Sequence, residues 1–124
     1  MSFDWSEYLT LAQALADAAP ASSSPEAHQR TAISRAYYAA FIQARNRLRD
    51  IERRPVPYMN VHEHIIQQFK YSRDYRRQRI GNELSILRSQ RTKVDYDNIV
   101  PNLPALMDQL LDRARRIVTL LNRL

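Results

Sequence analysis

Arg91 is the side chain whose position in this sequence is hardest to explain by packing alone. The apolar residues Ile80, Leu84 and Leu87 recur at three- and four-residue spacing, and the next step of that series falls on Arg91. Such spacing is typical of the buried face of a helix. Because an unpaired charge on a buried face is costly, the guanidinium needs a partner, a water-filled cleft or a bound anion. The alternative is a frayed helix end from which Arg91 extends into solvent.

Ionisable groups crowd the sequence around Arg91. They comprise two cations, two carboxylates and a phenol: Arg88, Lys93, Asp95, Asp97 and Tyr96. This mixture could bind phosphate and transfer protons. It could equally be a closed network of salt bridges that ties two helices together, which is the commoner arrangement.

A long helix with two apolar rows is predicted from Pro25 to about residue 50 or 51. Ser24 can cap it, and proline suits the first helical turn. The main row consists of Ile33, Ala36, Tyr37, Ala40, Phe41, Ala44, Leu48 and Ile51, and a second row of Arg35, Tyr38, Ile42, Arg45 and Arg49. Tyr38 and Ile42 are therefore candidates for a dimer interface, with packing inside the bundle as the alternative.

Four further helices are predicted from apolar spacing and capping residues. They cover residues 4–19 with Asp4 as the N-cap, residues 60–70, residues 74 to about 91, and residues 102–121. Residues 95–102 are expected to be a non-helical connection. Five amphipathic helices with short connections predict a single all-α domain over residues 1–124, built as an antiparallel bundle. The only glycine, Gly81, makes a hairpin-rich β fold improbable.

Composition restricts the chemistry and the partners. The net charge of +6 is suited to an acidic partner such as nucleic acid, a nucleotide or an acidic protein face. A chain without cysteine and with one glycine has neither a thiolate site nor a glycine-rich phosphate loop. We expect no cofactor and no metal site, because His62 and His64 diverge on a helix and His28 stands alone. No secretory signal or membrane-spanning run is evident, so a cytoplasmic protein without membrane contact is expected.

A second concentration of positive charge lies between residues 70 and 79. Five cations, Lys70, Arg73, Arg76, Arg77 and Arg79, are interleaved with Tyr71 and Tyr75. Arginine beside aromatic rings suits RNA, since cations meet phosphates and unpaired bases stack on rings. The commoner explanation is a solvated helix face.

Two runs of the sequence resemble the HEPN family of helical domains. Residues 30–41 (RTAISRAYYAAF) look like the second-helix signature of that family. Residues 83–97 (ELSILRSQRTKVDYD) are similar to a subgroup in which an arginine is followed by a small residue, Asp and Tyr. The resemblance implies a helical bundle that forms a symmetric homodimer. Catalytic members are metal-independent ribonucleases, often toxins paired with a nucleotidyltransferase antitoxin or parts of antiviral systems.

The family's active site combines an arginine and a histidine from both subunits, and Arg91 matches the arginine. The histidine is missing, and Asp95 or Tyr96 stands in its place. An ordinary Asp titrates near pH 3.9 and an ordinary Tyr near pH 10, so neither is a ready acid–base group at neutral pH. Because of their positions in this motif, Arg91, Asp95 and Tyr96 are nevertheless the candidate catalytic residues. Arg88, Lys93 and Arg35 are the candidate phosphate-binding residues.

The expected function is that of a HEPN-like dimer that binds RNA or a nucleotide within a toxin–antitoxin or defence system, as a divergent ribonuclease if it is catalytic. The alternative is a non-catalytic module that dimerises and docks a nucleotidyltransferase. A third reading, a purely structural dimer, would have Arg91 fully paired with carboxylates and no open cleft.

Overall fold

The computed structural model describes residues 2–124 and contains, within that range, five α-helices and no strand. The helices are α1 (Glu7–Ala18), α2 (Pro25–Asn46), α3 (Val61–Lys70), α4 (Tyr75–Tyr96) and α5 (Leu103–Asn122). A 3-10 turn over Ala19–Ala21 follows α1, and a π-helical turn over Arg47–Ile51 extends α2. The predicted all-α bundle is therefore confirmed. None of the helices in this range is both long enough and apolar enough to span a bilayer.

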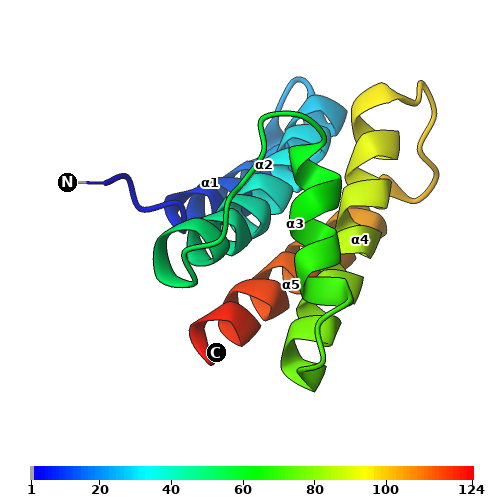
Figure 1. The fold of residues 1–124 in the computed structure, drawn as a ribbon. Coiled ribbons are helices and arrows are strands. Elements are labelled where there is room, and N and C mark those ends of the chain that lie inside the picture. Colours follow the sequence, from blue (N-terminus) through cyan, green and yellow to red (C-terminus); the bar gives the residue numbers. More distant parts are fainter. Residues whose placement is uncertain (1) are drawn as a thin grey trace.

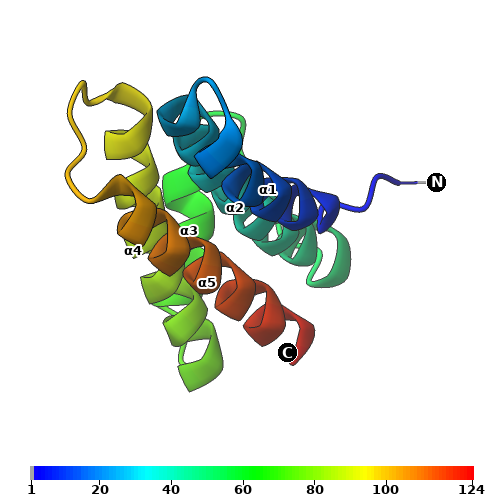
Figure 2. The same cartoon turned by 180° about the vertical axis from the view of Figure 1, so that it is seen from behind.

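Helix α2 is the centre of the bundle and contacts α1, α4 and α5 (Figure 1). Helices α3 and α4 lie side by side, and α5 packs across both α4 and the α1–α2 pair when seen from behind (Figure 2). Small side chains allow this close packing, since Ala32, Ala36, Ala40 and Ala44 of α2 are all fully buried. The main apolar row predicted for this helix is buried from Ile33 to Leu48.

The starts of two helices show how local capping sets their bounds. Helix α4 begins near Asp74 as predicted, and Asp74 is its N-cap, because its Oδ1 accepts the backbone N–H of Arg76 at 2.8 Å and that of Arg77 at 3.4 Å. The prediction that Asp4 is the N-cap of α1 was wrong, since Ser6 occupies that position. The Asp4 carboxylate instead accepts from the N–H and the hydroxyl of Ser6, at 3.0 and 2.6 Å.

Helix α4 continues to Tyr96, so the predicted end near Arg91 and the non-helical state of Asp95 and Tyr96 were wrong. Two features within the helix favour the extra turn. Val94 is fully buried, and Arg91 forms an ion pair with Asp95 one turn later, with 3.0 Å between Nη1 and Oδ2. Paired side chains four residues apart stabilise a helix.

Arg30 of α2 stabilises the same end of α4 from outside. Its Nη1 donates to the carbonyl oxygens of Val94 and Asp97, both at 2.7 Å, and its Nη2 donates to that of Asn98 at 3.2 Å. The last carbonyls of a helix have no partner inside it, and an arginine is well suited to satisfy them. This contact joins residues that are far apart in the chain, which is why the sequence pattern alone placed the end of α4 too early.

The single glycine marks the place where α3 and α4 touch. A Cβ at Gly81 would lie 2.3 Å from the backbone nitrogen of Lys70 and 2.5 Å from its Cα. Backbone atoms cannot rotate away as a side chain can, so any larger residue would force the two helices apart. Gly81 is thus required by packing and not by a special backbone angle.

We expect Gly81→Ala to destabilise the protein by at least about 1 kcal/mol, as overpacking does. At an unconstrained helical site the same change stabilises a protein by about 0.5–1 kcal/mol. The sign of the change in unfolding free energy therefore shows whether α3 contacts Gly81. Urea unfolding followed by circular dichroism measures it. Ser89→Ala, at an exposed site on the same helix, is the control and should change stability by less than about 0.5 kcal/mol. A stabilised Gly81→Ala protein would contradict the close approach.

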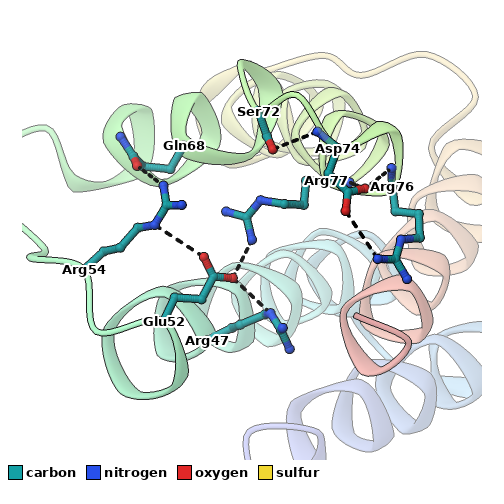
Figure 3. A network of polar contacts seen from close by, with 8 residues as sticks. All are labelled: Arg47, Glu52, Arg54, Gln68, Ser72, Asp74, Arg76 and Arg77. Atoms are coloured by element: carbon teal, nitrogen blue, oxygen red, sulfur yellow. Dashed lines mark hydrogen bonds and ion pairs between the residues drawn. The ribbon is translucent and has the colours of Figure 1, made fainter.

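Glu52 joins the end of α2 to α3 and α4 (Figure 3). Its Oε2 accepts from Arg77 and, at 3.1 Å, from Nε of Arg47, while its Oε1 lies 3.4 Å from Nε of Arg54. The guanidinium of Arg77 also lies 4.6 Å from the centre of the Phe69 ring. One carboxylate that is 15% exposed thus balances three guanidinium groups.

Glu52→Gln should lower the free energy of unfolding by about 2 kcal/mol, because it leaves three partly buried cations without their counter-ion. Asp112→Asn is the matched control. Asp112 is 66% exposed and, in the described range 2–124, its one ion pair is with Arg115, so its loss should cost less than about 0.5 kcal/mol. Equal effects of the two changes in urea unfolding would show that Glu52 is an ordinary surface charge.

Candidate functional site

The Arg91 side chain lies on the buried face of α4, as its place in the apolar series predicted. It is 11% exposed, and Ile80, Leu84 and Leu87 of the same series are fully buried. The guanidinium carbon lies 4.8 Å from the ring centre of Tyr37 and 5.5 Å from that of Tyr38, both on α2. These distances are in the range of cation–π contacts. The alternative of a frayed end with Arg91 in solvent is thereby excluded.

The charge of Arg91 is balanced only in part. Asp95 pairs with one terminal nitrogen, while Nε is buried and has no hydrogen-bond partner among residues 2–124. A second guanidinium contacts the same aromatic pair, since that of Arg35 lies 5.3 Å from the ring centre of Tyr38 and 5.1 Å from that of Tyr8. Arg35 forms no ion pair in the described part of the chain. The cluster therefore carries an excess of positive charge.

His62, in the first turn of α3, completes this cluster and was missed in the sequence as a candidate. Its Nδ1 lies 2.6 Å from the Tyr37 hydroxyl oxygen. Its ring stacks on Phe41 with 4.1 Å between ring centres and approaches Tyr38 edge-on at 6.0 Å. A sequence signal existed, because His62 lies three and four residues before the buried Ile65 and Ile66. The sequence pattern by itself points to His62 only as a possible metal ligand beside His64, at a spacing that does not suit one.

The surroundings fix the charge of both groups. Burial, followed by the charges of Arg88 and Arg91, lowers the pKa of His62 from 6.5 to about 4. Burial also raises the pKa of Tyr37 above its ordinary value, more than nearby arginines lower it. At neutral pH the phenol is therefore protonated and the imidazole is neutral. Nδ1 can accept from the Tyr37 hydroxyl or donate to it, and in the tautomer in which Nδ1–H donates, the lone pair of the imidazole lies on Nε2.

Two open hollows flank the cluster. A groove of about 630 Å³ runs between α3 and α4, and Arg88 and Lys93 are among the residues that line it. A smaller cleft of about 270 Å³ lies between α2 and the end of α4, with Arg35 and Asp95 in its wall. The three predicted phosphate-binding residues thus all line one of these two hollows, and Asp95, the ion-pair partner of Arg91, lines the smaller one.

The predicted catalytic set is divided by the fold. Arg91 and Asp95 are paired, but Tyr96 is 77% exposed and makes no hydrogen bond or ring contact among the described residues. Because α4 continues through Tyr96, the five residues from Arg91 turn its side chain by about 140° around the helix axis. The structure therefore places Tyr96 away from the Arg91 cluster.

The two residues predicted at a dimer interface differ in exposure. Tyr38 is half-buried at the edge of the cluster, whereas Ile42 is only 8% exposed in the single chain. Tyr38 therefore offers surface to a second subunit and Ile42 offers little. The interface itself stays a prediction.

The basic run from Lys70 to Arg79 does not form one surface. Arg76 and Arg77 are bound within the chain, to Asp74 and Glu52 respectively. Only Lys70 and Tyr71 of this run line the α3–α4 groove. Tyr75, Arg73 and Arg79 are exposed elsewhere, as the solvated-face explanation expects.

This arrangement can hold an anion and can present a neutral imidazole beside it. The guanidinium groups supply fixed positive charge, and the low pKa leaves His62 free to accept a proton once an anion reduces the local potential.

Comparison of the chain with models of protein families, with curated proteins and with solved structures found no match.

The pKa of His62 should be measurable as a midpoint near 4 in an NMR titration, and Arg88→Gln should raise it by removing a nearby positive charge. Arg79→Gln, on the same helix but outside the groove, should leave it unchanged. Because the unfolded imidazole titrates near 6.5, it binds its proton first as the pH falls. The free energy of unfolding should therefore decrease as the pH falls from about 6.5 to about 4. His62→Gln should flatten this dependence, and a His62 midpoint at its ordinary value would contradict the site.

Proposed function

We propose that this chain is a HEPN-like protein that binds RNA through the phosphate groups, with Arg91 as its anchor. The observation that carries the proposal is the partly balanced Arg91 guanidinium, which is 11% exposed, has one carboxylate partner and lies against two tyrosine rings. A charge held in this way, with Arg35 and Arg88 nearby, favours a bound anion. Arginine matches phosphate, as it matches carboxylate, by geometry as well as by charge.

The purely structural reading is less well supported by the site. It requires Arg91 to be fully paired and the surface beside it to be closed. Among residues 2–124 the buried Nε of Arg91 has no partner, and two open hollows are lined by its neighbours, one by Arg88 and the other by Arg35 and Asp95. Both observations favour binding.

Dimer formation belongs to the same proposal. Tyr38 is half-buried, and the cleft beside it is bounded by Arg35 and Asp95. A second subunit placed over this cleft would bring two copies of the Arg91 cluster together, as the HEPN resemblance implies. A toxin–antitoxin or antiviral role, with a nucleotidyltransferase partner, follows from the same resemblance.

For RNA cleavage, the proton-transfer role is better assigned to His62 than to Tyr96. His62 is a neutral imidazole in the Arg91 cluster, whereas Tyr96 faces solvent away from it. In such a reaction Arg91 would stabilise charge on the phosphate, and His62, in the tautomer with its lone pair on Nε2, would accept the proton of the attacking ribose hydroxyl. Asp95 would hold the arginine in position.

The test is equilibrium binding of a short single-stranded RNA over a range of salt concentrations. For the wild-type protein the logarithm of the binding constant should fall linearly with the logarithm of salt, by about 0.7 for each phosphate contact. Arg35→Gln and Arg91→Gln should weaken binding and flatten this slope. Asp95→Asn should strengthen binding, because it removes the negative charge next to the anchor.

Arg79→Gln is the control, since it changes the net charge equally at an exposed site outside the cluster. Circular dichroism establishes that each variant is folded. The proposal fails if the folded wild-type protein has no salt-dependent affinity for RNA, or if Arg91→Gln and Arg79→Gln behave alike.

The second candidate is a non-catalytic module that docks a nucleotidyltransferase. The observation that favours it is an apolar hollow of about 460 Å³ at the α4–α5 connection, where Ile99 is 83% exposed beside Val100 and Leu106. Under this reading, Ile99→Asp would abolish binding of the partner protein, and the wild-type chain would bind no RNA.

A further inference from the structure

We propose that the groove between α3 and α4 is a binding site for a nucleotide unit of single-stranded RNA, with the base stacked on Tyr71 and the phosphate held by Arg88 and Lys93. This inference rests on the proposed RNA-binding function and gives it a location and a ligand. The groove lies beside the Arg91 cluster, because Arg88 lines it and also acts on the proton affinity of His62.

The charge of the groove is the first observation. Its cations are Lys70, Arg88 and Lys93, and its single carboxylate is Glu63, which gives a net charge of +2 (three cations minus one anion). Among the residues that the structure describes, none of the three cations forms an ion pair, whereas many of the other arginines do. The Glu63 carboxylate is already engaged, since it accepts from the side-chain amide of Gln67 at 3.1 Å.

The aromatic wall is the second observation. Tyr71 lies at the end of α3 and is 73% exposed. Its ring is near one cation, with Nζ of Lys70 at 5.8 Å from the ring centre, and makes no ring–ring contact in the described part of the chain. A nucleotide can use both features, because its base stacks on the exposed ring and its phosphate contacts the unpaired cations. An acidic peptide would use the cations but has no base to stack on the ring.

The hydroxyl groups of α4 are the third observation. The hydroxyls of Ser85 and Ser89 form no hydrogen bond with any described residue. The hydroxyl of Thr92, in contrast, donates to the carbonyl oxygen of Arg88 at 3.0 Å. Two free hydroxyls on the groove wall can pair with the ribose, whose 2′-hydroxyl both donates and accepts.

The size of the groove fits one such unit. Its volume of about 630 Å³ falls within the usual range for small-ligand sites. From Ser85 to Thr92 the wall of α4 is on the order of 10 Å long, at about 1.5 Å per residue. A base at the Tyr71 end and a phosphate at the Arg88 end can therefore be bound together.

Lysine labelling gives a direct test, because Lys70 and Lys93 are the only lysines in the sequence and both line the groove. The protein is treated with an amine-reactive reagent with and without a short single-stranded RNA, and labelling is read by mass spectrometry. RNA should protect both lysines severalfold, while the N-terminal amine serves as the internal reference. Adenosine monophosphate in a parallel experiment distinguishes a free nucleotide from a unit within RNA as the source of the protection.

Matched variants test the two contacts separately. Tyr71→Ala should weaken RNA binding at least about fivefold through lost stacking. Tyr75→Ala removes a tyrosine that is equally exposed, 75% against 73%, but lies outside the groove, and should leave affinity unchanged. Arg88→Gln should lower the salt slope by about 0.7, whereas Arg79→Gln should not.

The groove is the wrong location if the wild-type protein binds RNA while both lysines stay fully reactive and Tyr71→Ala behaves like Tyr75→Ala. In that case RNA binding through Arg91 would stand. Protection of the lysines by an acidic peptide but not by RNA or the mononucleotide would overturn the inference as well. Complete absence of RNA binding by the folded wild-type chain would remove the proposed function together with this site.

Discussion

The guanidinium of Arg91 lies on the buried face of α4, against the rings of Tyr37 and Tyr38 and beside the carboxylate of Asp95. Removing a charge from water is costly, and one carboxylate with two ring contacts of about 0.5–2 kcal/mol each offsets that cost only in part. The aromatic pair can meet α4 because the alanines of α2 let the helices approach closely. The packing of α2 on α4 therefore determines the environment of the Arg91 charge, because the rings that contact the guanidinium belong to α2.

Burial, together with this positive charge, sets the protonation of the cluster. Burial, followed by the charges of Arg88 and Arg91, keeps the imidazole of His62 neutral at physiological pH, where it is hydrogen-bonded to the phenol of Tyr37. Anion binding would relieve the repulsion and raise the proton affinity of His62. The histidine would then become a better base when a phosphate is bound than when the site is empty, which couples binding to proton transfer through electrostatics alone.

Much of the architecture could be predicted from the sequence, because the helices follow from local patterns. The apolar row on α4, the row on α2 from Ile33 to Leu48 and the start of α4 near Asp74 are set by neighbouring residues, and the structure confirms them, whereas Ile51 at the end of the α2 row is 66% exposed. The end of α4 could not be found in this way, since Arg30 satisfies its carbonyls from another helix. The burial of Arg91 was predictable from its spacing. The presence of His62 beside it was not, because its partners come from α2 and α4 and only the tertiary fold brings them together.

Gly81 has a consequence for recognition as well as for packing. Where it meets the backbone of Lys70, the two helices are in direct contact and cannot slide past one another without a clash. The walls of the groove between α3 and α4 are thus held at a fixed separation before any ligand arrives. A preorganised surface loses little conformational entropy on association. Gly81 thereby sets the distance between Lys70 on α3 and the groove cations Arg88 and Lys93 on α4.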